Sequence, residues 1–473
     1  MLILSTTPNS AYLLHLAEHR LQSNAPEAKE VLELAVMADT AKPTWELRLR
    51  IANLLAAKGN KDKAKEIISG IDVSEYVRES NTSGQVKLLL SVLVMFNRID
   101  EALNLLESEN TAKRITIFDD FDIRLRIANE LINDRQTEKA KNLLYTIDVN
   151  KAYAENPDLK NGYARVSWAR YIPMDMAYEK VIPYFEKDVQ CGRLQGEWQL
   201  NFAQALMVVG REDKAEKLLE DTYRNDRITS NGFSRCGFLR YFHFNYEPEK
   251  ALSWFDKDLY RDRISGNWII YHATALAAAG NIDDAMSMVE QAYKKDAQLI
   301  NGYALIAWYG YIIRNYDPKK ALSTFKKDQK LHRINSGADN YLFGIHTYLG
   351  NRNKVERMVN ISYEREKKIS GSYTLIGFCE YLRNGDLDYL FSMVKKDEKL
   401  ERLRVPFLRY IYAAVLLKFG EVEKSKFFVK DAVTRSELSV NFAKTWLKRF
   451  GCADEKRISG LINSELEDMF AKL

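Results

Sequence analysis

A block of sequence that recurs every 70 residues constrains the fold of this chain more than any other feature. NGYARVSWARY begins at Asn161, NGFSRCGFLRY at Asn231, NGYALIAWYGY at Asn301 and GSYTLIGFCEY at Gly371. A second, shorter block (GREDKA, GNIDDA, GNRNKV and GEVEKS) keeps the same step. A fixed period of this size is typical of an array in which each unit packs on its neighbours. The sequence therefore predicts a solenoid instead of one large core.

Each unit divides into two helical hairpins of about 35 residues, close to the period of known helix–turn–helix arrays. In the shorter hairpin, Trp198 and Phe202 stand one helical turn apart, in a pattern typical of an amphipathic helix. Gly210 ends that helix, because a helix C-terminus often needs a left-handed residue. In the longer hairpin, Asp317 is placed to cap the second helix and Pro318 to begin it.

The repeats predict three parts of the chain. RLRIAN occurs at Arg48 and again at Arg124, so the first part has its own step of 76 residues. We predict diverged helical repeats over 1–155, four double units over 156–435, and capping helices over 436–473, where the end of an array must show water a polar face. No Gly/Ser-rich or Pro-rich linker separates the parts.

These repeats resemble the tetratricopeptide-repeat (TPR) superfamily. The resemblance implies an all-α fold, a right-handed α-solenoid of TPR-like helix–turn–helix repeats. It also implies small residues where the two helices of a hairpin touch, because overpacking there costs about 1–3 kcal/mol. These positions fall on Ser167, Ala203, Gly237, Ala273, Ala307, Gly377 and Ala413. The proline that closes each repeat of the family is absent here, replaced by polar turns.

Aromatic residues recur beside the small positions of the longer hairpins. They form pairs at i and i+3, which share a helix face: Trp168 and Tyr171, Phe238 and Tyr241, Trp308 and Tyr311, Phe378 and Tyr381. The resemblance implies that such positions often line a concave groove where ligands bind. The alternative is that the rings form the core between repeats, since a register error of one residue rotates a helix by about 100°.

Two further recurring patterns predict structural roles. The Asn-Gly openings, such as Asn231-Gly232, are interpreted as a helix cap followed by a tight turn. The Phe-x-Lys-Asp pattern ends at Asp188, Asp258 and Asp328, and its polar residues are interpreted as solvated helix ends and inter-repeat hydrogen bonds.

The sequence does not favour an enzyme, a metal site or a cofactor. His15-Leu16-Ala17-Glu18-His19 has zinc-ligand spacing, but no third ligand accompanies it, so we interpret it as the solvated face of a terminal helix. There is no phosphate-binding glycine loop and no Cys-x-x-Cys. The four cysteines are scattered and no apolar run could span a membrane, and since the N-terminal residues have no basic segment before their short apolar run, we expect no signal peptide. We therefore expect a cytoplasmic protein.

The leading functional hypothesis is a non-enzymatic scaffold that binds a protein or peptide partner in its concave groove. An RNA-binding helical repeat is the first alternative, since aromatic rings stack on bases. A net charge of +5 gives it little support, and Arg170 and Arg240 are followed in the later copies by Gly310 and Glu380. The second alternative is an accessory protein that contacts polysaccharide or a glycan-synthesis enzyme.

Overall fold

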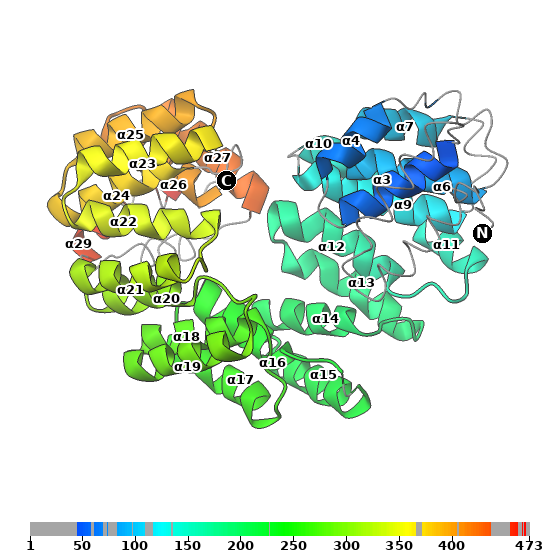
Figure 1. Cartoon of the computed structure of the whole chain (residues 1–473), viewed down its shortest axis with the longest axis horizontal. Coiled ribbons are helices and arrows are strands. Elements are labelled where there is room, and N and C mark those ends of the chain that lie inside the picture. Colours follow the sequence, from blue (N-terminus) through cyan, green and yellow to red (C-terminus); the bar gives the residue numbers. More distant parts are fainter. Residues whose placement is uncertain are drawn as a thin grey trace, which may run out of the picture. The chain divides into compact units, whose positions relative to one another are not determined.

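The structure, a computed structural model, describes most of the chain beyond residue 44. The described residues are 45–57, 61–69, 73, 83–96, 98–108, 117–133, 136–226, 228–365, 371–403, 406–436, 455–461, 466 and 468–469. Every regular element in these ranges is a helix (Figure 1). The contacts divide the chain into two compact units, Met1–Pro173 and Met174–Leu473. The predicted three-part division stays a prediction, and the histidine pattern at 15–19 lies outside the described residues.

The first unit consists of helical hairpins. Its helices are α3 (Trp45–Ala57), α4 (Lys61–Ser69), α6 (Ser83–Met95), α7 (Ile99–Glu107), α9 (Ile117–Asn133), α10 (Thr137–Tyr145), α11 (Val149–Glu155) and α12 (Gly162–Asp175), near whose end the second unit begins. The hairpin partners α3 and α4, α6 and α7, and α9 and α10 pack on each other, and α6 also packs on both α3 and α9. The two RLRIAN segments therefore lie in corresponding helices of two hairpins.

The second unit holds most of the 70-residue repeats. Its first helices are α13 (Tyr178–Gln190), α14 (Glu197–Val208), α15 (Glu212–Asn225), α16 (Gly232–Gly237), η1 (Phe238–Phe244), α17 (Pro248–Tyr260), α18 (Asn267–Ala279) and α19 (Ile282–Lys295). They are followed by α20 (Gly302–Ile306), η2 (Ala307–Arg314), α21 (Pro318–Lys330), η3 (Ser336–Ala338), α22 (Asp339–Tyr348), α23 (Arg352–Arg365), α24 (Ser372–Asn384), α25 (Leu387–Lys399), α26 (Pro406–Lys418), α27 (Val422–Ser436) and α29 (Glu455–Leu461).

Packing in the second unit follows the chain, as the labels from α14 to α27 in Figure 1 show. Each hairpin packs its two helices together, for example α18 on α19 and α24 on α25. The first helices of successive hairpins also contact one another, as α14 does α16 and α22 does α24. The predicted all-α fold, an array of helical hairpins that pack on their neighbours, is therefore confirmed for the described residues.

The small positions lie where helices approach most closely. A Cβ added to Gly237 would lie 2.3 Å from the Cβ of Trp254, and one added to Gly377 would lie 2.8 Å from the Cβ of Met393. Both distances are too short for real side chains, which explains the glycines. The remaining small positions are also buried, namely Ser167, Ala203, Ala273, Ala307 and Ala413.

The segments η1 and η2 are π-helical and continue α16 and α20 without a break. In η1, the N–H of Asn245 at its end bonds to the carbonyl of Arg240, five residues earlier. A π-helical turn accommodates one residue more than an α-helical turn and is often found at functional sites. The additional residue of the second and third copies therefore lies within a π-helical turn at the end of the first helix of the long hairpin.

A buried tyrosine–aspartate contact joins each short hairpin to the long hairpin after it. The Tyr223 hydroxyl donates to Asp258 Oδ1 at 2.6 Å and accepts from the N–H of Gly232 at 2.6 Å. The N–H of Ser234 donates to Asp258 Oδ2 at 2.7 Å. The next two copies repeat this geometry with Tyr293, Asp328, Gly302 and Ala304, and with Tyr363, Asp397, Ser372 and Thr374.

These aspartates are fully buried, so the expectation that they are solvated helix ends is wrong. The expected inter-repeat hydrogen bonds are confirmed. Burial raises the pKa of the carboxyls of Asp258, Asp328 and Asp397, although the hydrogen bonds they accept oppose that shift. Burial of a charged group is acceptable only with such partners, and the tyrosine and the backbone amide provide them.

The Asn-Gly openings work differently from the expected cap and turn. Asn231 itself adopts the left-handed conformation (φ 62°), and its side chain makes no capping bond. Its Oδ1 instead accepts from the N–H of Ser265 at 2.8 Å, in the connection between α17 and α18. Gly232 is required for space, because an added Cβ would lie 2.8 Å from a methyl of Leu219.

Candidate functional site

The predicted aromatic pairs are divided between the core and the surface. Trp308 and Phe378 are 1% and 0% exposed, and Tyr241 is 9% exposed. Trp308 lies against Gly344, where a Cβ would be 2.6 Å from the indole ring, so the glycine provides the space for this ring. The half-buried members are Trp168, Tyr171, Phe238, Tyr311 and Tyr381.

Several of the predicted rings also have intramolecular partners. The Tyr241 hydroxyl donates to Glu212 at 2.5 Å, and the Tyr381 hydroxyl donates to the Arg457 carbonyl at 3.2 Å. Tyr311 packs against the core cluster that contains Trp308. Trp308 and Phe378 therefore present no face to a ligand, and a groove role for the other six residues stays a prediction.

A different set of rings forms a continuous chain of contacts on the first helices of four successive hairpins. Phe238 lies 5.9 Å from Trp268 and 4.8 Å from Tyr271, measured between ring centroids. It stacks on Phe242 at 5.0 Å, which in turn contacts Tyr309 at 5.1 Å. Tyr309 contacts Tyr341 at 6.5 Å. We call these six residues the aromatic strip: Phe238, Phe242, Trp268, Tyr271, Tyr309 and Tyr341.

The aromatic strip is accessible over most of its members. Phe242 is buried beneath the others at 1% exposure, whereas the remaining five rings are half-buried. Trp268 and Tyr271 lie 5.2 Å apart near the start of α18. In the ranges that the structure describes, the indole N–H and the phenol hydroxyl of this pair have no hydrogen-bond partner, and neither atom is buried. Both are therefore available as donors.

An ion pair borders the aromatic strip at Trp268. The Arg235 guanidinium lies 5.9 Å from the centre of the Trp268 ring, within reach of a cation–π interaction. Its two terminal nitrogens bind the two carboxylate oxygens of Glu197 at 3.0 and 3.2 Å. The arginine side chain is 19% exposed, whereas that of Glu197 is 71% exposed. The carboxylate is therefore the more accessible member of this ion pair.

Sequence analysis missed the members of the aromatic strip that come from short hairpins. The predicted aromatic pairs all lie in the longer hairpins, whereas Trp268, Tyr271 and Tyr341 lie in α18 and α22 of the short hairpins. The signal was present, because Trp198 precedes Trp268 by the repeat length and Tyr271 precedes Tyr341 by the same step. In the third copy the surface ring is Tyr309, one residue after the predicted Trp308.

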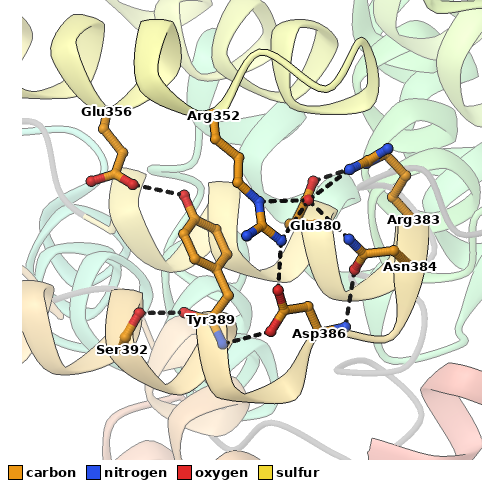
Figure 2. A network of polar contacts seen from close by, with 8 residues as sticks. All are labelled: Arg352, Glu356, Glu380, Arg383, Asn384, Asp386, Tyr389 and Ser392. Carbon is orange, nitrogen blue, oxygen red and sulfur yellow. Dashed lines mark hydrogen bonds and ion pairs between the residues drawn. The ribbon is translucent and has the colours of Figure 1, made fainter.

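A second feature lies between the third and fourth copies of the repeat, where Figure 2 shows a polar network centred on Glu380. The Glu380 carboxylate is fully buried and accepts from Arg352 at 2.7 Å, from Arg383 at 2.7 Å and from Asn384 at 3.0 Å. Arg352 also binds Asp386 at 2.6 Å. The two guanidinium groups lower the pKa of Glu380 against the opposing effect of burial.

An open cavity of about 630 Å³ lies beside this network, lined by Gly350–Lys354, Glu380, Arg383 and Asn384. The arginines that line it are already paired with Glu380 and Asp386. Their charges are therefore used within the molecule, and we assign the network a structural role. Among the described residues, no group of three His, Cys, Asp or Glu side chains is placed to hold a metal ion.

No protein-family model matches the sequence, and no curated protein matches it. Among solved structures, the chain is similar to the APC/C hetero-tetramer Cut9–Hcn1 (13% identity, TM-score 0.33, 94% of this chain and 97% of that chain). It is also similar to Naa15/Naa10 bound to HypK-THB (13% identity, TM-score 0.28, 98% and 84%). Scores this low leave the function to be argued from the chain's own residues.

None of the helices that the structure describes combines the length and the apolar character required to cross a bilayer.

Proposed function

We propose that this chain is a helical-repeat scaffold, without chemistry of its own, that binds a protein or peptide partner on the aromatic strip. The observation that carries the proposal is the half-buried pair Trp268 and Tyr271, whose two donors have no partner in the described residues. Tryptophan and tyrosine dominate the energetics of protein interfaces, because each joins a large rigid ring to a polar tip. The contacts among the six rings support one shared surface.

RNA binding has weaker support at this site. Phosphate groups require cations, and most of the affinity of nucleic-acid binders comes from that term. The cation beside the aromatic strip, Arg235, is already held by both carboxylate oxygens of Glu197. A binding measurement over a series of salt concentrations tests this directly, since phosphate contacts produce a steep loss of affinity with rising salt.

The experiment compares the proteins captured from native lysate by the full chain and by the double variant Trp268→Ala/Tyr271→Ala. Quantitative mass spectrometry, with and without nuclease, measures each captured protein. We expect the specific partner to be lost from the double variant and retained after nuclease treatment. Tyr260→Ala is the control, because Tyr260 is 93% exposed at the end of α17 and makes no ring contact with the aromatic strip.

A double variant that melts at the same temperature as the parent chain and still captures the same partner would remove the aromatic strip as the binding surface. Capture that disappears with nuclease would favour the RNA alternative instead.

A further inference from the structure

The geometry points to a more specific ligand: we propose that the aromatic strip binds a proline-rich segment in the polyproline II conformation, flanked by a basic residue. This inference rests on the proposed function and names the class of peptide. Its basis is the combination of accessible rings, donors without acceptors, and an exposed carboxylate at one edge.

The hydrogen-bonding character of Trp268 and Tyr271 determines what a ligand must supply. The indole N–H can only donate, and the phenol hydroxyl has a proton that no described acceptor takes. A ligand that fills this site must therefore present acceptors. A polyproline II segment has no internal hydrogen bonds, so its carbonyl groups are free to accept. Proline has no N–H, so such a segment brings few donors that would need partners.

The rings suit the apolar side of the same ligand. Proline-rich segments dock on surfaces lined by aromatic side chains, and their stiff backbone loses little conformational entropy on binding. Phe238 contacts both Trp268 and Tyr271, so these three rings form one half-buried face. Tyr309 and Tyr341, on the next two hairpins, are half-buried and are joined to these rings through the buried Phe242. An extended ligand can therefore run across several repeats.

The ion pair at the Trp268 end of the aromatic strip favours a basic residue beside the proline-rich segment. Glu197 is 71% exposed, while its partner Arg235 is 19% exposed and lies against Trp268. A cation at the end of the bound segment would lie closer to the exposed carboxylate than to the less exposed guanidinium, and an anion would be favoured less. A sugar chain satisfies the site less well, because its many hydroxyl donors need acceptors, whereas Trp268 and Tyr271 offer donors.

Fluorescence polarisation with a labelled oligoproline peptide that ends in arginine tests the proposal on the full chain. We expect saturable binding that is at least about tenfold tighter than that of a glycine–serine peptide of equal length and charge. Exchanging the terminal arginine for glutamate should weaken binding several-fold, and Glu197→Gln should reduce that difference.

Two variants remove the donors and keep an aromatic ring. Tyr271→Phe removes the hydroxyl alone and should raise the dissociation constant of the peptide about tenfold, the value of one hydrogen bond of roughly average strength. Trp268→Phe also loses part of the ring area and should raise the dissociation constant at least as much. Tyr260→Ala should bind like the parent chain. Equal binding of the oligoproline and glycine–serine peptides would overturn the proposal, and so would full affinity in both phenylalanine variants.

The lysate and peptide experiments together distinguish a failure of this inference from a failure of the proposed function. If Trp268→Ala/Tyr271→Ala loses its partner from lysate while the oligoproline peptide does not bind, the scaffold function stands and the ligand class is wrong. Binding of a neutral oligosaccharide on the same variants, with no binding of the peptide, would likewise overturn the proline-rich ligand.

Discussion

The third and fourth copies of the repeat differ by one residue of chain length, and the difference changes the type of helix. From Asn301 to Asp317 the third copy contains η2, a π-helical segment. The corresponding segment of the fourth copy, from Gly371 to Asp386, is one residue shorter and is α-helical throughout α24. Because a π-helical turn holds one additional residue, both copies reach the same buried tyrosine–aspartate contact.

The same comparison explains where the aromatic strip ends. In the third copy, the residue after Trp308 is Tyr309, which is half-buried and belongs to the strip. In the fourth copy, the residue after Phe378 is Cys379, which is 1% exposed. The contacts between repeats are therefore the same in both copies, whereas the side chains that the first helix of the long hairpin exposes to solvent differ.

The next position along the helix changes even more between copies. Arg240 of the second copy donates to the carbonyl of Val208 at 2.7 Å. The third copy has Gly310 there, and Arg314 lies near the corresponding carbonyl of Ala278 at 3.5 Å. The fourth copy has Glu380, which holds two arginines. One cation that satisfies a helix end is thus replaced by a buried carboxylate network.

The largest predicted effect concerns this network. Glu380→Leu should lower the free energy of unfolding by about 3 kcal/mol, because it leaves Arg352 and Arg383 close together without their shared carboxylate. Partial exposure of the two arginines, 37% and 33%, keeps the cost at the lower end of the range for buried ion pairs. Chemical denaturation followed by circular dichroism measures the change.

The matched variant is Arg240→Met, which removes a single hydrogen bond and should cost about 1 kcal/mol. Equal costs for the two variants would show that Glu380 does no more for stability than the residue it replaces.

The second prediction compares the small positions. Gly237→Ala should cost about 2 kcal/mol, since its new Cβ would lie 2.3 Å from the Cβ of Trp254 and the backbone would have to shift. Gly377→Ala should cost less, because the nearest atom, the Cβ of Met393, is 2.8 Å away and the helices would have to separate by a smaller distance. The third copy already has Ala307 at this position. Thermal denaturation ranks the two variants, and the reverse order would contradict this account.

The third prediction concerns acid stability at the junction with the fourth copy. His346 is 5% exposed, and burial, with Lys354 and Lys326 nearby, lowers its pKa to about 4. Its ordinary value is about 6.5. The neutral form is therefore favoured in the folded state, so this contribution to stability is present above about pH 6.5 and is lost as the pH falls towards about 4. We expect a loss of between about 2 and 3 kcal/mol over that interval, since one pKa unit corresponds to about 1.4 kcal/mol.

His346→Gln should flatten this part of the stability profile. The corresponding residue of the preceding short hairpin is Leu276, which does not titrate. Buried His272 has its pKa lowered by desolvation and acts with the same sign. The raised pKa of Asp328 acts with the opposite sign, since its contribution is lost as the pH rises. An unchanged profile in His346→Gln would assign the acid sensitivity to His272 or to other groups.

The repeat period and the helix pattern were sufficient to predict the fold, because spacing and turn residues such as Gly210 act locally. The tyrosine–aspartate contacts were predicted only in part. Their partners come from different hairpins, and sequence alone does not show that Asp258 lies inside. The position of Trp308 depends on Gly344 of the next hairpin and on the additional residue within η2. A pattern search with 3.6 residues per turn takes neither of them into account, so it could not predict that this ring is buried. The Trp268 and Tyr271 pair was not predicted, because the recurring aromatic pairs of the sequence lie in the long hairpins and this pair lies in a short one.

The smallest predicted effect on stability, and the sharpest test of the comparison, is deletion of Ile313. This shortens the third copy to the length of the fourth, so that Tyr311-Ile312-Arg314 matches Tyr381-Leu382-Arg383. We expect η2 to become α-helical with a change of no more than about 1 kcal/mol in the free energy of unfolding, because a π-helical turn has poorer geometry than the α-helical turn that replaces it.

Binding should change more than stability does. If the additional residue is the reason that Tyr309 is exposed to solvent, its removal should bury this ring as Cys379 is buried in the fourth copy. The affinity for the oligoproline peptide should then fall several-fold. Ile313→Leu keeps the chain length and is the control, with binding and stability close to those of the parent. A crystal structure of the deletion variant tests this directly. A retained π-helical turn, or an α-helix with Tyr309 still half-buried, would show that the type of helix does not determine which ring is exposed. The end of the aromatic strip would then be explained by the identity of Cys379 alone.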